Sequence, residues 1–227
     1  MPQGRISSCG NCGAASSPFA TWANAATTLG GVVTPMVAGD TIFASNGSTM
    51  ASAGMTVTVP GTTASPSRII SGTEDTTSGI TAVAAGAVIG STNATFSLTG
   101  NFFADAITWR QDTASTAVMI IGNGSGNVQW HRDCRFEILN STTTAAVQLG
   151  TATGSVSSLI TLERPIFKFS AAGQRLNINY NVRIIGGSID ATGTAPTGLV
   201  SISSGTRGAK LIWDDLDATN MAAAGNL

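Results

Sequence analysis

The second half of the chain alternates short apolar runs with polar loops in a repeating pattern. One set of runs starts at intervals of roughly 25 to 29 residues, at 117–121, 145–149, 174–178 and 198–202. Each run is followed by a loop and a longer apolar segment, and these segments are 127–137, 159–169, 181–190 and 210–217. A strand-only repeat of this length indicates a solenoid, because one coil buries its inward side chains only when neighbouring coils stack on it.

The region from Ala38 onward also shows the pattern of short strands. Its apolar runs are three or four residues long and are bounded by Gly, Ser, Pro or Asn, which is typical of strands separated by turns. The runs are 41–44, 56–59, 68–71, 80–83 and 87–89. No helical spacing interrupts them.

One helix is expected, near the N-terminus. Ser17 is a suitable N-cap and Pro18 fits the first helical position. Apolar side chains then recur at spacings of three and four, at Phe19, Trp22, Ala25, Ala26 and Leu29. We therefore predict a helix over about 17–29 that caps a β-helix domain of residues 17–227, and a flexible N-terminal arm over 1–16.

The predicted fold class is all-β, a single-stranded right-handed parallel β-helix with a short N-terminal capping helix. A β-sandwich or jelly roll is the alternative, because antiparallel sandwiches also carry turn signals every 8–12 residues or so. The length of the repeat favours the solenoid.

Composition limits the function classes. The chain has 227 residues, of which 42% are hydrophobic and 10% are charged, with a formal net charge of −1. This balance argues against disorder, and the lack of a basic cluster argues against a nucleic-acid partner. The uncharged stretch between Asp75 and Asp105 is interrupted by polar residues, so no membrane-spanning helix is expected. The first residues contain no apolar signal segment, which favours maturation in the cytoplasm.

Three stretches carry a resemblance to a known family. Residues 18–23 read Pro-Phe-Ala-Thr-Trp-Ala, residues 38–43 read Ala-Gly-Asp-Thr-Ile-Phe, and residues 56–66 run from Thr-Val-Thr-Val through Pro-Gly-Thr-Thr to Pro. Together they resemble the opening of pectate-lyase-like right-handed parallel β-helix proteins. The resemblance implies a capping helix, a turn into the first coil and about six to eight coils. The chain lacks the rows of acids and bases of the enzymes, and so looks more like a bacteriophage virion protein.

Candidate chemistry lies in three carboxylates. Glu137, Asp190 and Asp217 take similar places in their coils, and Lys168 lies in the coil that follows Glu137. Adjacent coils stand about 4.8 Å apart, so Asp190 and Asp217 could approach the spacing of a glycosidase pair. The alternative is that these are solvated turn charges. We expect no catalytic residue and no cofactor.

A second candidate is a zinc site. Cys9 and Cys12 form a Cys-x-x-Cys motif, and His131 and Cys134 supply a second pair of zinc-competent donors. The alternative places His131 on an exposed strand face and Cys134 in the core. Four tryptophans are further candidates, as sugar-stacking platforms, with Trp130 and Trp213 in similar places of separate coils; the others are Trp22 and Trp109.

The expected function is that of a non-enzymatic bacteriophage virion structural protein, which decorates or cements a capsid as a minor capsid protein. Low surface charge favours a homo-oligomer bound to the major capsid protein or other virion subunits, assembled in the host cytoplasm. No nucleic acid or membrane partner is expected. The alternative is a tail fibre or tailspike-like module that binds or depolymerises polysaccharide.

Overall fold

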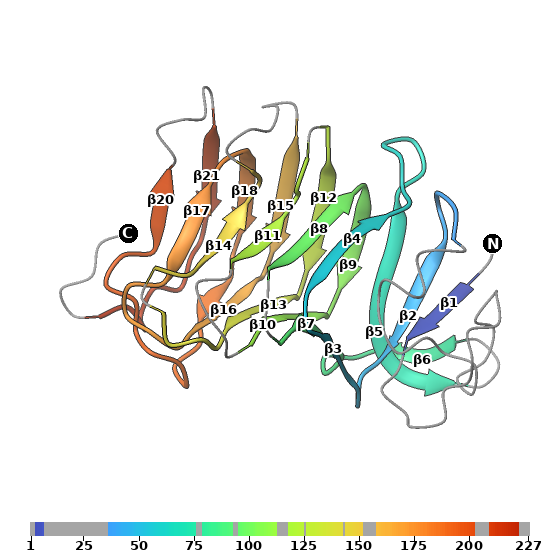
Figure 1. Ribbon diagram of the computed structural model, residues 1–227, viewed down its shortest axis with the longest axis horizontal. Helices are drawn as coiled ribbons and strands as arrows, with labels where there is room; N and C mark the ends of the chain where they lie inside the picture. The colour runs from blue at the N-terminus through green and yellow to red at the C-terminus, as the bar shows by residue number, and fades with distance from the viewer. Residues whose placement is uncertain are drawn as a thin grey trace.

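The computed structural model describes residues 3–6, 36–75, 79–92, 95–112, 118–124, 126–142, 144–151, 158–202 and 209–222. Within these ranges the chain forms strands and no helix. The strands lie side by side in a stack that runs from the N-terminal to the C-terminal end of the molecule (Figure 1).

Three sheets run along the stack. Sheet A holds β1 (Gln3–Ile6), β2 (Thr41–Ser45), β5 (Ser67–Asp75), β9 (Phe102–Asp105), β12 (Val128–Arg132), β15 (Leu159–Glu163), β18 (Asn181–Ile185) and β21 (Lys210–Asp214), with β6 (Gly79–Val83) paired to β5. Sheet B holds β3 (Thr49–Ser52), β7 (Val88–Ser91), β10 (Thr108–Gln111), β13 (Arg135–Ile138), β16 (Ile166–Phe169) and β19 (Ser188–Ile189). Sheet C holds β4 (Met55–Val59), β8 (Phe96–Gly100), β11 (Met119–Ile121), β14 (Ala146–Leu149), β17 (Arg175–Ile178) and β20 (Val200–Ile202).

The chain visits the sheets in the order A, B, C and then starts the next coil. Each strand pairs in parallel with its counterpart one coil away, as β12 does with β9 and β15. Among the described strands, only β5 and β6 pair antiparallel. The parallel β-helix is therefore confirmed, with six complete coils, whereas a β-sandwich would require antiparallel neighbours.

The repeat seen in the sequence corresponds to this winding. The shorter apolar runs become the sheet C strands β11, β14, β17 and β20, and the first three longer segments each become a sheet A strand followed by a sheet B strand. The fourth longer segment becomes the sheet A strand β21, followed by an isolated bridge from Asp217 to Ser188. What the pattern does not predict is the bend between them. From β9 onward two residues make this bend, and the first has a positive φ: Ala106, Asp133, Arg164, Gly186 and Asp215.

The bend also explains which side chains fill the corner. After the left-handed residue, the second residue of the bend points inward, and Ile107, Cys134 and Pro165 are all buried there. The N–H groups of the first four left-handed residues each donate to a carbonyl of the next coil, as Asp133 does to Glu163 at 2.9 Å. The expectation that Cys134 fills the core is confirmed.

Inward side chains form columns that run the length of the stack. In sheet B, one column consists of Ile89, Trp109, Phe136, Phe167 and Ile189, all buried. The rings of Phe136 and Phe167 stack with their centroids 5.6 Å apart. Because each coil covers the inward side chains of its neighbours, the columns form one continuous apolar core.

The predictions for the N-terminal residues fall only partly within the residues that the structure describes. The expected capping helix over 17–29 lies outside the described residues, as does most of the expected arm. Residues Gln3–Ile6 of that arm form β1, which pairs in parallel with β2.

Gly150 provides a test of the packing at the corner between sheets C and A. Its φ is +89°, and an added Cβ would lie 2.3 Å from the Tyr180 ring. We expect Gly150→Ala to lower the free energy of unfolding by about 3 kcal/mol in urea titrations, through backbone strain and overpacking.

The matched control is Gly126→Ala. Gly126 also has a positive φ, +73°, but an added Cβ there meets no atom within 4 Å. This variant should lose about 1 kcal/mol. Equal losses in the two variants would show that the contact with Tyr180 contributes nothing.

Candidate functional site: the outer face of sheet A

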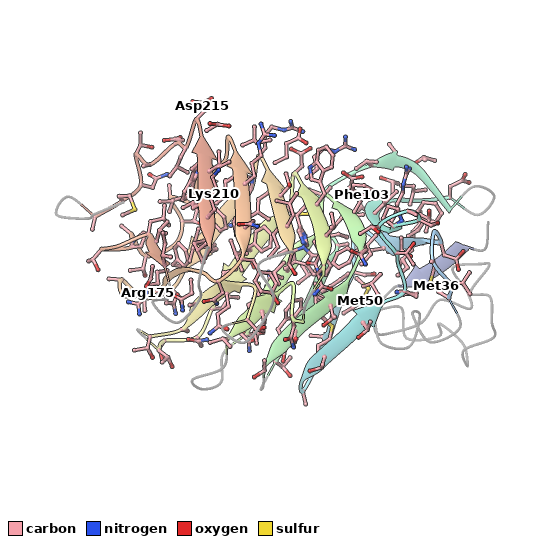
Figure 2. All side chains as sticks on the ribbon, turned by 90° about the horizontal axis from the view of Figure 1, so that it is seen from above. Met36, Met50, Phe103, Arg175, Lys210 and Asp215 are labelled. Atoms are coloured by element: carbon pink, nitrogen blue, oxygen red, sulfur yellow. The ribbon has the colours of Figure 1, made fainter. Side chains whose placement is uncertain are left out.

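The outer face of sheet A, called the A face below, carries three rows of aligned side chains. Residues alternate inward and outward along each strand, and the parallel register brings equivalent residues of successive coils together. The first row is Val128, Leu159, Asn181 and Lys210. The middle row is Arg68, Phe103, Trp130, Thr161, Arg183 and Ile212. The third row is Asp105, Arg132, Glu163, Ile185 and Asp214. Figure 2 shows these strands side by side from Phe103 to Lys210.

A hollow of about 310 Å³ lies at the N-terminal half of the A face. Trp130 is 41% exposed, and its ring centroid lies 5.7 Å from that of Phe103, with the rings tilted by 58°. The remaining lining comes from Arg68, Ala104, Asp105 and Arg132. The hollow therefore offers an aromatic surface bordered by charged groups.

Positively charged side chains outnumber negatively charged ones at the hollow. The Arg132 guanidinium donates to the Asp105 carboxylate at 2.7 Å, which raises the pKa of Arg132 and keeps it charged. Arg68 forms no ion pair with the other described residues. Two guanidinium groups thus face one carboxylate, which favours a ligand that combines an apolar surface with negative charge.

The three carboxylates named as candidates in the sequence analysis do not form a catalytic pair in the structure. Glu137, Lys168 and Asp190 follow one another in a row on the outer face of sheet B. Asp217 is out of register with them, because it bridges to Ser188 instead. The prediction that Asp190 and Asp217 approach each other across adjacent coils is therefore wrong, because Asp217 aligns with a residue two positions before Asp190.

Each of these carboxylates has its own partners. Glu137 accepts hydrogen bonds from Arg110 at 2.7 Å and Arg135 at 2.5 Å, and Arg135 also pairs with Asp190. Burial acts to raise the pKa of Glu137, but these hydrogen bonds outweigh it, so the pKa of Glu137 lies below its ordinary value.

The two aspartates also stabilise turns of identical sequence, Asp-Ala-Thr. Asp190 accepts from the N–H and hydroxyl of Thr192, and Asp217 does the same with Thr219. The hydrogen bonds from the Thr219 backbone and hydroxyl lower the pKa of Asp217. This geometry agrees with the alternative stated for the sequence, that these aspartates are charged residues of turns.

His131 is fully buried, so the expectation of an exposed strand face is wrong. It occupies an inward column of sheet A, next to Ala104 and Leu162 in the register. Trp109 donates its indole N–H to His131 Nδ1 at 3.1 Å, and Nε2 lies 3.3 Å from the Gln129 side-chain oxygen. This pairing requires the neutral ring with its proton on Nε2.

The zinc donors are not brought together within the described residues. Both ring nitrogens of His131 have partners, and the Cys134 thiol lies 3.5 Å from the Ala104 carbonyl oxygen. Burial raises the pKa of Cys134 to about 12, which opposes formation of a metal-binding thiolate. Cys9 and Cys12 lie outside the described residues, and no group of three His, Cys, Asp or Glu ligands occurs in the described part.

The tryptophans separate into two environments. Trp130 is an outward residue of sheet A, whereas Trp213 aligns with Ile184 in an inward column and contacts Phe167 edge to face. A one-residue difference in register reverses the face, so the prediction of similar places is wrong. Trp109 lies in the core, and Trp22 lies outside the described residues.

Sequence reasoning did not find Arg68, Phe103 and Asp105. Arg68 lies in the coil that contains the inserted strand β6, so it falls outside the regular period. Phe103 and Asp105 precede Trp130 and Arg132 by one regular coil length, but they lie before the first apolar run of the repeat described in the sequence. Alignment of Phe103 with Trp130 in the parallel register is the signal that identifies the hollow.

Comparison with protein-family models, with curated proteins and with solved structures found no match for this chain. The resemblance to pectate-lyase-like proteins therefore stays a prediction. None of the described residues forms a helix that is long and apolar enough to span a membrane.

His131 makes stability depend on pH in a defined window. Burial lowers the pKa of His131 from 6.5 to about 3, so between these values the unfolded chain binds a proton that the folded chain does not. Stability is complete above pH 6.5 and is lost as the pH falls. From pH 7 to pH 5 we expect a loss of about 2 kcal/mol in the free energy of unfolding, measured by urea titration.

The control is His131→Gln, which keeps a neutral hydrogen-bonding side chain but cannot titrate. Its free energy of unfolding should change by less than about 0.5 kcal/mol over the same range, because carboxylates titrate mainly below pH 5. The same loss in both proteins would contradict the assignment to His131.

Proposed function

We propose that this chain is a non-enzymatic structural protein of a bacteriophage virion, which decorates or cements the capsid. The observation that supports this best is that charged side chains form ion pairs between successive coils. In the described coils they join one coil to another: Arg132 pairs with Asp105, Arg164 with Asp133, and Arg110 with Glu137.

These pairs suit a stiff module better than a catalytic cleft. Each joins residues of successive coils, in parallel with the backbone ladders of three sheets. An ion pair at the surface contributes little individually, but several pairs between successive coils together resist sliding of one coil over the next. Glu137 and Asp190, the acids closest to each other in the sheet B row, are held by Arg135 and are not free for proton transfer.

Sparse surface charge supports attachment to other subunits. A freely dispersed domain usually carries roughly 25–35% charged residues on its surface, whereas this chain has 10% in total. The partners we propose are the major capsid protein or other virion subunits, together with further copies of this chain.

The test is to locate the protein on particles. Phage particles from the source of this sequence are purified, heads and tails are separated, and both fractions are analysed by quantitative mass spectrometry. We expect many copies of the chain in the head fraction. Its absence from purified particles would refute the virion assignment, and its confinement to tails would refute the capsid role.

The hollow on the A face supports a second candidate, a tail-associated module that binds polysaccharide. Exposed Trp130 beside Phe103 offers a flat apolar surface for a sugar ring, and Arg68 adds a donor. For this function, Trp130→Ala should weaken binding of host-surface oligosaccharides more than tenfold by calorimetry. Ile166→Ala, on the outer face of sheet B, should leave the affinity unchanged. Equal affinities of both variants and the unaltered protein, or no binding at all, would exclude it.

A further inference from the structure

The A face gathers exposed apolar side chains. Among the described residues, eight large hydrophobic side chains are exposed, and four of them lie on this face: Val128, Trp130, Leu159 and Ile212. Val128 and Leu159 are direct neighbours in the register, and Trp130 lies two residues from Val128 on the same strand. Such a contiguous patch with charged neighbours is typical of protein interfaces, in which Trp and Arg dominate the binding energy.

The rows of the A face are arranged so that a two-fold rotation can bring them against the same rows of a second copy. Consider an axis that runs parallel to the strands, in front of the A face and between β12 and β15. Rotation about it places β12 against β15 of a second copy, β9 against β18, and β5 against β21. Because the axis is parallel to the strands, each row faces the same row of the second copy.

This rotation pairs complementary residues. In the first row, Val128 faces Leu159 of the second copy, so apolar side chains meet twice. In the third row, Arg132 faces Glu163 of the second copy, so opposite charges also meet twice. A symmetric contact of this kind needs one self-complementary patch, and every favourable pair occurs in duplicate.

The middle row extends the complementarity to the hollow. Phe103 faces Arg183 of the second copy, an exposed residue whose nearest carboxylate, on Asp214, is 3.9 Å away. The aromatic pair Phe103–Trp130 provides a cation–π surface for this guanidinium. Arg68, which lacks an ion pair within the described residues, faces Ile212 of the second copy in the same row, and Asp214 lies two residues further along that strand.

The hairpin of β5 and β6 is compatible with this arrangement. Ile80 on β6 packs against Phe43 and Ile70 on the outer side of sheet A, and so covers this side over β2 and the far part of β5. Because the rotation places β5 opposite β21, the covered part lies at or beyond the last described sheet A strand of the second copy. The rows from β9 to β18 stay free to meet.

We infer that the A face binds a second copy of this chain, sheet against sheet, about a two-fold axis between β12 and β15. The proposed function includes a homo-oligomer, and this inference names the surface through which its copies meet. The inference rests on the proposed function only for the role of that homo-oligomer in a virion. The contact of Arg132 with Glu163 and the apolar contact of Val128 with Leu159, each made twice, favour a second copy over an unrelated acidic partner.

The first test is sedimentation of the full chain over a concentration series from roughly 1 to 100 μM. The unaltered protein should form dimers. Leu159→Glu places two like charges in the centre of the contact and should weaken dimerisation at least thirtyfold. The matched control is Ile166→Glu, because Ile166 is also the first residue of a strand and is 36% exposed, but lies on sheet B. It should leave dimerisation unchanged.

Charge exchange provides the second test. Arg132→Glu and Glu163→Arg should each weaken dimerisation at least tenfold, and the double variant should recover most of the affinity. Within one chain the double variant still loses the pairs Arg132–Asp105 and Glu163–Arg164. Recovery of the dimer therefore reports on the contact between copies.

Three results would overturn the inference: a monomer at all concentrations, equal effects of Leu159→Glu and Ile166→Glu, or no recovery in the double variant. Dissociation of the dimer by host oligosaccharides would support it, since the sugar would occupy the same Trp130 surface. A dimer from a protein that is absent from particles would refute only the virion assignment. A monomer that is abundant on heads would refute only the A-face contact.

Discussion

The alignment of each strand with its counterpart one coil away is the constraint on which this structure depends. It satisfies the backbone hydrogen bonds of three sheets at once, and it brings equivalent side chains into columns. A column inside the stack must be apolar or internally paired, and a column outside it becomes a row of surface groups. Both the core and the A face therefore follow from one register.

Polar groups in the core show how strict this constraint is. His131 stands in a column of aliphatic residues, and the column remains compatible with burial because Trp109 and Gln129 reach it from adjacent positions. Tyr180 lies against Gly150, which leaves the space its ring needs. In both cases a residue of a neighbouring coil, Trp109 for His131 and Gly150 for Tyr180, helps to make the buried position acceptable.

This dependence sets the limit of what the sequence reveals. The spacing of apolar runs identified the sheet C strands and the fold, because coil length is recorded directly in the chain. The strand β3, with the sequence Thr-Met-Ala-Ser, has little apolar character and was not expected. The face on which Trp213 lies, the burial of His131 and the hollow beside Trp130 all depend on register between coils. That register depends on the lengths of the connections from sheet B to sheet C and from sheet C to sheet A, which differ from coil to coil, and composition does not record them.

The bend from sheet A to sheet B has a consequence for how such a protein changes. From β9 onward this corner always has two residues, whereas the connections from B to C and from C to A differ in length from coil to coil. Chain length is thus free to vary at two corners of the triangular cross-section and is fixed at the third. New surface loops can be acquired at the variable corners with the rows of the A face left in place, so recognition by loops and assembly through the flat face are able to evolve independently.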